Sequence, residues 1–411
     1  MQNALIFSPS FDGHRQVHVF VMVQVLEELG FNIFIAGNTQ EKISNSFYID
    51  KLKNKPAIRI LDTNNYSDGG LKITLSEFVE LQNKCEANLT IFAEADNHIS
   101  LFNSQIFKKK SRLRGKVIGT FLRPFYYYRK TPFLDKLRFI KHFFSRWKKD
   151  EKLFFTFILK RFSLLDVSLS IDENFADHHP KFTWIPDVFQ QYAEIIIKKN
   201  ESPAQGEWIE KLKAFKEKNK DRFPFLYFGT AQYRRGYDVL LKLAEETGGC
   251  FIHCGLRDPD AKFSYNTDEI KSKLKNEGRL FETNEYIEDP VCIEYFFRSV
   301  SHLILPYTRN FFGSSGVMSQ ALEYGIPILA PDSGIMGHRI KKHRLGQTYS
   351  TSKKDSLKLA FNDFKNMSPN EFRKDIRSYM KTQSTEYLRS TLLNSFGHPS
   401  KKLTNPTMQE A

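Results

Sequence analysis

The sequence predicts an α/β protein built from two doubly wound parallel-sheet domains of similar size, and three observations carry that prediction. Short apolar runs alternate with segments of helical periodicity along most of the chain. A polar, lysine-rich stretch over residues 197–222 divides the chain into two halves. The length of 411 residues accommodates two or three domains, at about 100–200 residues per domain.

The first half begins with a strand, a loop, a helix and a second strand. We expect a buried strand at residues 4–7 and a helix from Val17 to Leu29, ended by Gly30. A β-loop-α-β opening is the usual start of a doubly wound parallel sheet. Further strands are predicted at residues 31–36, 57–61, 89–93, 117–121 and 166–171, with a helix at 76–87. The alternation continues to about residue 188.

A second α/β series follows the polar stretch. Its strands are predicted at residues 224–228, 250–254, 279–282, 302–305 and 326–330. The predicted organisation is an N-terminal domain over 1–190, a polar linker or helix over 191–222 and a C-terminal domain over 223–370. Residues 371–411 are expected to supply a helix that packs back toward the N-terminal domain, followed by a loose polar tail.

Composition places the chain among soluble globular proteins. Hydrophobic residues make up 41% of the chain and charged residues 26%, which excludes a disordered chain, a collagen and a small disulfide-stapled protein. The four cysteines are too few and too scattered for a disulfide framework or a zinc site, which predicts reduced thiols in a cytoplasmic protein. Residues 1–7 show no signal-peptide pattern, and no run approaches the roughly 18 apolar residues of a membrane span.

Positive charge is concentrated in one segment, residues 108–162, called here the basic segment. The whole chain has 61 basic and 47 acidic residues and a net charge of +14. Between residues 108 and 161 there are 18 Lys/Arg and three acids, so this stretch has a net charge of +15 and the rest of the chain −1. The distribution predicts a local contact with an acidic partner.

The basic segment has the pattern of an amphipathic helix from Thr131-Pro132 onward. Phenylalanines and Trp147 fall on one face, with lysines and arginines over the rest. A basic helix of this kind suits an anionic membrane surface. The alternative is an apolar face packed on the N-terminal core, with merely solvated charges; no nucleic-acid recognition module is present, so no nucleic-acid partner is expected. The predicted membrane-binding residues are Lys141, Arg146, Trp147, Lys148 and Lys149.

The strongest chemical signal lies between residues 305 and 334. The loop Gly313-Ser-Ser-Gly316 leads from a strand into a helix that stops at Gly325, and a further strand ends in the loop Asp332-Ser-Gly334. Small residues at a helix N-terminus expose backbone N–H groups, and the helix dipole adds partial positive charge. This pattern predicts a diphosphate site, although the same residues also suit a plain turn with a serine N-cap.

A second signal, Phe228-Gly-Thr-Ala-Gln-Tyr-Arg-Arg-Gly236, follows the first strand of the second half. It places Arg234 and Arg235 one loop away from a strand end. Arginine suits bidentate recognition of phosphate. The alternative is a pair of solvated surface arginines.

These two motifs make residues 224–350 similar to the C-terminal domain of family-four glycosyltransferases of the GT-B fold. That family has a strand ending in Gly-Arg-Leu, with Lys-Gly six residues after the first Gly. Here Gly229 matches, Thr230 replaces the Arg, and Arg235-Gly236 stand for Lys-Gly. The family's Glu-x7-Glu pattern falls on Phe312 and Gln320. In the first half, Gly13-His14 resemble the glycine-rich loop, and Arg123 stands where many relatives have His.

The resemblance implies two Rossmann-like doubly wound domains facing each other across a cleft. It also implies retaining, metal-independent transfer of a sugar from a UDP- or GDP-sugar. Together with the basic segment, it predicts a lipid-linked or cell-envelope glycan as the acceptor and a cytoplasmic protein peripheral to the inner face of the membrane. No cofactor besides the nucleotide sugar is expected, and Asp258-Pro-Asp260, in a polar loop, is not expected to bind metal. The donor would contact Gly13, His14, Gly229, Thr230, Ser314, Ser315, Gly316 and Gln320. Arg235, Arg234 and Asp96 would be catalytic, with Glu94 and Arg123 on the acceptor side.

The replacements at Thr230, Phe312 and Gln320 leave a second hypothesis open. A non-catalytic glycan- or lipid-binding protein on the same fold would not need the contacts that the family's residues make at these positions. Stabilisation by UDP or GDP would distinguish an enzyme with a donor site from such a protein, because a ligand stabilises the folded state that binds it.

Overall fold

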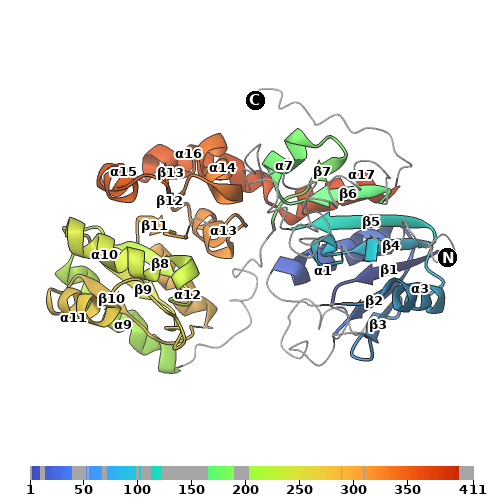
Figure 1. Cartoon of the computed structure of the whole chain (residues 1–411), viewed down its shortest axis with the longest axis horizontal. Helices are drawn as coiled ribbons and strands as arrows, with labels where there is room; N and C mark the ends of the chain where they lie inside the picture. The colour runs from blue at the N-terminus through green and yellow to red at the C-terminus, as the bar shows by residue number, and fades with distance from the viewer. Residues whose placement is uncertain are drawn as a thin grey trace, which may run out of the picture. The chain divides into compact units, whose positions relative to one another are not determined.

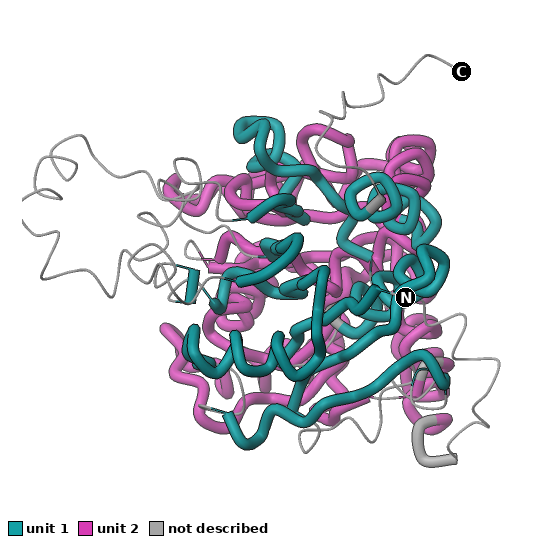
Figure 2. The backbone as a smooth tube through the Cα atoms, turned by 90° about the vertical axis from the view of Figure 1, so that its right-hand side faces the viewer, with its two compact units in different colours: residues 1–188, 384–411 teal, residues 189–383 magenta. Residues whose placement is uncertain are grey.

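The structure is a computed structural model of the chain, and it describes the parts of the chain given at the end of this paragraph. Within those ranges, no helix combines the length and apolar composition that a membrane crossing requires. The chain divides into two compact units, drawn in teal and magenta in Figure 2. Unit 1 comprises residues 1–188 and 384–411, and unit 2 comprises residues 189–383. The described ranges are 2–9, 14–38, 52, 55–66, 72–98, 101–102, 113–122, 165–188, 203–287, 289–308 and 311–397.

Unit 1 is built on a seven-stranded parallel sheet in the order β3-β2-β1-β4-β5-β6-β7. Strand order reverses between β1 and β4, as in a doubly wound sheet. Neighbouring residues of β1 face opposite sides of the sheet: Ile6 packs in the core beside α1, and Phe7 in the core beside α3. The strands are β1 (Asn3–Phe7), β2 (Asn32–Gly37), β3 (Ile58–Asp62), β4 (Leu89–Phe92), β5 (Lys116–Phe121), β6 (Val167–Ser170) and β7 (Phe182–Trp184).

Helices cover both faces of the sheet in unit 1 (Figure 1). The last helix, α17, returns to this unit after the chain has built unit 2, and it packs against α1. Leu388, Leu392 and Phe396 of α17 belong to the same apolar core as Val21 and Val25 of α1. The helices are α1 (His14–Glu28), α3 (Leu75–Lys84), η3 (Ala95–Asn97), α7 (Glu173–His178) and α17 (Thr385–Gly397).

Unit 2 is built on a six-stranded parallel sheet in the order β10-β9-β8-β11-β12-β13. Its order reverses between β8 and β11, so the two strands that begin the two halves of the sheet lie side by side. Leu226 faces one apolar core and Tyr227 the other. The strands are β8 (Phe225–Phe228), β9 (Phe251–Cys254), β10 (Leu280–Glu282), β11 (His302–Ile304), β12 (Ile328–Pro331) and β13 (Gly346–Tyr349).

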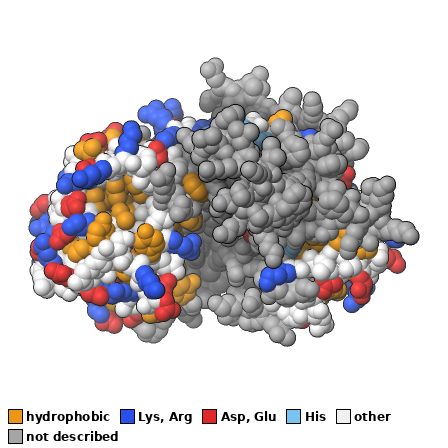
Figure 3. Space-filling view, in the orientation of Figure 1, with side chains coloured by type: hydrophobic (Ala, Val, Ile, Leu, Met, Phe, Trp, Pro, Cys, Tyr) orange, Lys and Arg blue, Asp and Glu red, His pale blue; other side chains and the backbone are white. Residues whose placement is uncertain are grey.

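The helices of unit 2 also cover both faces of its sheet (Figure 1). On the described side chains of this unit, acidic and basic residues are interspersed (Figure 3). The helices are α9 (Pro203–Lys218), η5 (Tyr233–Arg235), α10 (Tyr237–Thr247), α11 (Thr267–Asn276), α12 (Pro290–Arg298), α13 (Gly316–Glu323), α14 (Gly334–His343), α15 (Ser356–Phe364) and α16 (Asn370–Thr382).

The strands predicted from the sequence are all present, with bounds within two residues of those expected. Two further strands, β7 and β13, complete the edges of the two sheets. Residues 203–218 of the expected linker form α9, whose Leu212 is buried in a core of unit 2. The helix predicted from Thr131 lies outside the described residues.

Candidate functional site

A candidate ligand site lies at the carboxyl ends of β8 and β11 in unit 2. The strand order reverses between these two strands, and in open α/β sheets ligands bind at such a switch point. The loop after β8 covers residues 229–236, and the loop after β11 leads to α13. The sequence motifs that contain Arg235 and Ser315 are therefore brought to the same edge of one sheet.

Backbone contacts join these two loops. The N–H of Thr308 donates to the carbonyl oxygen of Arg234 at 3.2 Å. Gly236 has a positive φ of 69°, and a Cβ built on it would lie 1.7 Å from the carbonyl oxygen of Pro306. Only glycine fits this approach without displacing the neighbouring loop.

Arg235 lies against the glycine that ends β8. A Cβ built on Gly229 would lie 2.1 Å from Nη1 of Arg235, so the guanidinium occupies the space that a side chain at 229 would need. No described carboxylate pairs with this guanidinium. Arg234 is exposed, and its Nε donates to the side-chain oxygen of Gln232 at 3.1 Å. Neither arginine pairs with a described carboxylate, and Arg235 is the one whose guanidinium lies against Gly229 at the end of β8.

Ser315 organises the start of α13. Its hydroxyl accepts from the N–H of Met318 at 3.4 Å and lies 3.1 Å from the hydroxyl of Tyr307, so it is the N-cap of the helix. The N–H groups of Gly316 and Val317 fall in the first turn, where a helix has no carbonyl to offer them. The two interpretations of this motif, a turn with a serine N-cap and a helix start that can bind an anion, are therefore compatible. Ser315 accepts from the N–H of Met318 and leaves the N–H groups of Gly316 and Val317 open.

The loop after β12 closes on the same edge. Gly334, at the start of α14, has a φ of 71°, and a Cβ there would lie 2.6 Å from Cα of Phe312. The N–H of Ile335 donates to the carbonyl oxygen of Phe312 at 3.1 Å. Position 312 thus supports the loop through its backbone. Gln320 of α13 is 7% exposed, and its Nε2 has no hydrogen-bond partner among the described residues.

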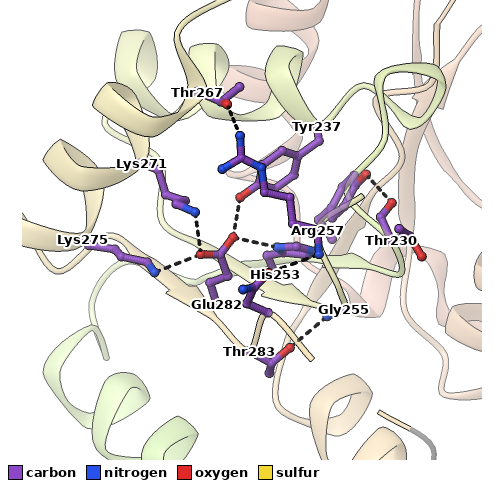
Figure 4. Close-up of polar contacts among 12 residues, drawn as sticks. Thr230, Tyr237, His253, Gly255, Arg257, Thr267, Lys271, Lys275, Glu282 and Thr283 are labelled. Carbon is purple, nitrogen blue, oxygen red and sulfur yellow. Dashed lines mark hydrogen bonds and ion pairs between the residues drawn. The ribbon is translucent and has the colours of Figure 1, made fainter. Parts of the chain in front are cut away.

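A buried polar network lies directly behind the loop after β8 (Figure 4). His253 of β9 is fully buried; its Nε2 is 3.1 Å from the carbonyl oxygen of Gly229, and its Nδ1 is 3.3 Å from Oε1 of Glu282. Tyr237 and Lys275 also donate to the Glu282 carboxylate. Burial alone raises the pKa of Glu282, but hydrogen bonds from His253, Lys275 and Tyr237 outweigh it and hold that pKa well below its usual range.

Sequence reasoning missed this network. His253 lies inside an otherwise apolar strand and Glu282 ends another strand, 29 residues further on. A charged residue at the end of a short apolar strand was the one available signal, but the sequence does not show that β9 and β10 are neighbours.

Several solved structures align with nearly the whole chain. A sucrose-phosphate synthase from Thermosynechococcus elongatus gives a TM-score of 0.57 at 12% identity, over 97% of this chain and 98% of that one. Anabaena Alr3699/HepE in complex with UDP gives 0.60 at 11% identity, over 97% and 100%. WaaG, a glycosyltransferase involved in lipopolysaccharide biosynthesis, gives 0.56 at 12% identity, over 95% and 99%. No family model and no curated protein match the sequence.

The chain has the GT-B fold. Its two parallel-sheet units correspond to the two Rossmann-like domains of that fold.

In unit 1 of this GT-B chain, Glu94 and Asp96 follow β4, at the switch point of the sheet. Both side chains are buried, and Oδ2 of Asp96 accepts from the N–H of Leu122 at 2.5 Å. The structure thus gives Asp96 a structural contact at the end of β5. His14 starts α1, but its side chain lies outside the described part of the chain, as do Gly13 and Arg123. The same holds for the predicted membrane-binding residues Lys141, Arg146, Trp147, Lys148 and Lys149.

The described part of the GT-B chain contains no group of three His, Cys, Asp or Glu side chains suited to holding a metal ion. Asp258 accepts from Gln232 and from the N–H of Asp260, both at 3.1 Å, so its carboxylate holds a turn. The four cysteines are buried and form no disulfide, and burial raises the pKa of Cys85 and Cys250 to about 11. These thiols are therefore protonated at neutral pH.

Proposed function

We propose that this protein is a glycosyltransferase that transfers a sugar from a nucleotide-diphosphate sugar to a glycan acceptor. The observation that carries the proposal is the switch point of unit 2, where the loop with Arg235 and the start of α13, with the N–H groups of Gly316 and Val317, lie at the same edge of the sheet. Ligands of open α/β sheets bind outside the strand ends at this point, in the place called here the crevice. A site of this kind suits a diphosphate. Complexes of Anabaena Alr3699/HepE with UDP and with UDP-glucose support a uridine nucleotide as the first candidate.

The proposed reaction breaks the bond between the anomeric carbon and the diphosphate oxygen, and forms a bond from that carbon to an acceptor hydroxyl oxygen. Negative charge grows on the departing diphosphate, and Arg235 with the N–H groups of α13 would stabilise it. Because this interaction strengthens in the transition state, it raises the rate as well as the affinity. The acceptor proton would pass to the departing phosphate. Retention of configuration and catalysis without a metal ion are part of the proposal, on the resemblance to family four.

The acceptor is proposed to meet unit 1, where Glu94 and Asp96 lie after β4. The net charge of +15 between residues 108 and 161 favours a lipid-linked or cell-envelope acceptor at an anionic membrane surface. The proposed location is therefore the cytoplasmic face of a membrane, with peripheral attachment.

Arg235→Ala tests the role of the unpaired arginine. We expect kcat to fall by about 10²–10³, equivalent to about 2–4 kcal/mol, as when one donor to a developing anion is removed. The assay is release of UDP or GDP from a panel of nucleotide sugars with glycan acceptors, with EDTA present in parallel. Arg298→Ala, at an exposed arginine of α12, is the matched control and should keep full activity. Near wild-type kcat for Arg235→Ala would show that the assignment of Arg235 is wrong, and activity lost in EDTA and restored by Mn²⁺ would overturn metal independence.

A second candidate function is binding of a glycan or lipid without catalysis. Thr230, Phe312 and Gln320 stand at three positions where family-four enzymes have charged residues, and this favours the alternative. Thermal unfolding with UDP and GDP separates the two. An enzyme with a donor site gains about 2.7 kcal/mol at a ligand concentration 100 times Kd, whereas a protein without one shows no shift.

A further inference from the structure

The Glu282 carboxylate is the centre of an unusually well-paired buried cluster. Its side chain is 1% exposed, and four groups from three elements surround it. Tyr237 of α10 donates to Oε1 at 2.7 Å, while Lys275 and Lys271 of α11 lie 2.9 Å and 3.3 Å from Oε2. A buried charge is costly unless its oxygens are satisfied in this way, so the carboxylate is ionised and fixed in position.

His253 connects this carboxylate to the backbone of the candidate donor loop. One ring nitrogen faces Oε1 of Glu282 and the other faces the carbonyl oxygen of Gly229, and both of these atoms are acceptors. A neutral imidazole has only one N–H, so the ring satisfies both contacts only when both nitrogens carry protons.

The Gly229 carbonyl is held tightly by this contact. Gly255 packs behind it, and a Cβ at position 255 would lie 2.3 Å from the Gly229 oxygen. In a trans peptide the N–H of the next residue points opposite to the carbonyl. The N–H of Thr230 therefore points away from β9, toward the side of β8 that borders β11 and the crevice. No described residue accepts a hydrogen bond from it.

We propose that the Glu282–His253 pair is a positioning unit that fixes the Gly229–Thr230 peptide so that the Thr230 N–H is presented to an anionic diphosphate in the crevice. This inference rests on the proposed function and specifies how the donor loop recognises its ligand. His253 and Glu282 touch neither ligand nor reacting atoms; they act through the peptide.

A purely structural role would not require these residues. Phe251 and Ile252 precede His253 in β9, and apolar side chains fill such buried parallel strands at lower cost than an ion pair. The presence of a charged pair here is explained by its contact with the carbonyl oxygen of Gly229, which an apolar side chain at position 253 could not make.

The test compares His253→Leu, His253→Gln and Glu282→Gln with His302→Leu as the matched control. His302 is also a buried histidine of the sheet in unit 2, but it lies at the opposite end of β11, and burial lowers its pKa to about 4. We expect His253→Leu to weaken UDP binding about tenfold and to leave uridine binding unchanged, because only UDP carries the diphosphate. His253→Gln, which keeps one donor, should recover part of the loss. His302→Leu should change neither affinity, whatever its effect on stability.

Equal affinity of wild type and the His253 and Glu282 variants for UDP would overturn the inference while leaving the proposed function standing. If the wild type binds neither UDP nor GDP, the proposed function fails, and nitrogen-15 NMR of the free protein still decides the inference. It predicts that Glu282→Gln and His253→Leu shift the Thr230 amide signal. An unchanged Thr230 signal in both variants would overturn it. Should His253→Leu fail to fold, Glu282→Gln carries the same comparison.

Discussion

Single glycines determine how closely the loops of the crevice approach one another. Gly236, which precedes α10, has a left-handed backbone conformation and lies against the carbonyl of Pro306. Gly248, which follows α10, has nearly the same φ but open space around it. The two positions separate the cost of backbone conformation from the cost of a steric clash.

Gly248→Ala should lower the free energy of unfolding by about 1–2 kcal/mol, because L residues are strained at positive φ. Gly236→Ala should cost more than that and should also weaken UDP binding, since its Cβ would push the loop after β11 away from Arg234. Urea titration with and without UDP measures both effects. Equal losses of stability in the two variants would show that the contact between the loops carries no strain.

The residues of the crevice were predictable from sequence to the extent that they lie close together along the chain. Gly229 and Arg235 share one loop, and Ser315 starts one helix, so local patterns indicated them. His253 and Glu282 were not predictable, because their contact depends on the lateral order of β9 and β10 and on which side of the sheet each residue faces.

Among the elements of unit 2, α11 and α13 each begin at a side-chain N-cap. Ser315 caps α13 at the crevice, and Asn266 caps α11, away from β11, with its side chain accepting from the N–H of Glu269. Both caps satisfy one donor in the first turn of a helix, but only the first borders the proposed diphosphate site.

Ser315→Ala and Asn266→Ala should each lower the free energy of unfolding by about 1 kcal/mol. Ser315→Ala should in addition weaken UDP binding, because the hydroxyl also lies against Tyr307 and fixes the turn that presents the N–H groups of α13. Calorimetric titration with UDP provides the readout. If Asn266→Ala weakens UDP binding as much as Ser315→Ala does, the effect on the nucleotide is a general loss of stability.

Elements with a strong apolar pattern were predictable, and elements without one were not. The strands near the centre of each sheet are runs of buried apolar residues, which the sequence shows directly. β13 reads Gly-Gln-Thr-Tyr and β7 has only three residues, so neither carries a periodic apolar signal; pairing with a neighbouring strand makes them strands.

At the scale of the whole molecule, unit 1 is discontinuous in sequence. The chain leaves it at residue 188 and returns at residue 384 with α17. Lys116 of β5 donates to the carbonyl oxygens of Ser395 and Phe396 at 3.0 and 3.1 Å, which satisfies groups that the end of the helix leaves open. Unit 1 therefore depends on both ends of the chain.

Leu392→Ala should destabilise unit 1 by about 2–5 kcal/mol, because Leu392 is fully buried in the core that α17 shares with α1. The unfolding of unit 2, followed by its stabilisation with UDP, should stay unchanged. Leu359→Ala, at an exposed leucine of α15, is the control in the other unit. Hydrogen exchange resolved by segment would reveal the pattern, and equal loss of protection in β1 and β8 would contradict it.

The basic segment should bring the protein to anionic membranes. Each basic residue near such a surface contributes about 1 kcal/mol, and the effect fades within a Debye length, so binding should weaken with salt. The fourfold variant with Lys141, Arg146, Lys148 and Lys149 changed to Glu should co-sediment less with anionic liposomes while still binding UDP. A wild-type protein that ignores anionic liposomes at low salt would make a soluble acceptor the better hypothesis.

The return of α17 to unit 1 also determines the order in which the two units can complete their folding during translation. During translation the ribosome completes unit 2 before it releases the helix that closes the core of unit 1. The valines of α1 that pack against α17 are synthesised early, whereas α17 is synthesised after unit 2. The nascent chain therefore carries an uncovered apolar surface while the second sheet folds. A chain stopped after residue 383 would contain the whole candidate donor site and yet keep this surface exposed, which makes such a product a substrate for chaperones and proteases.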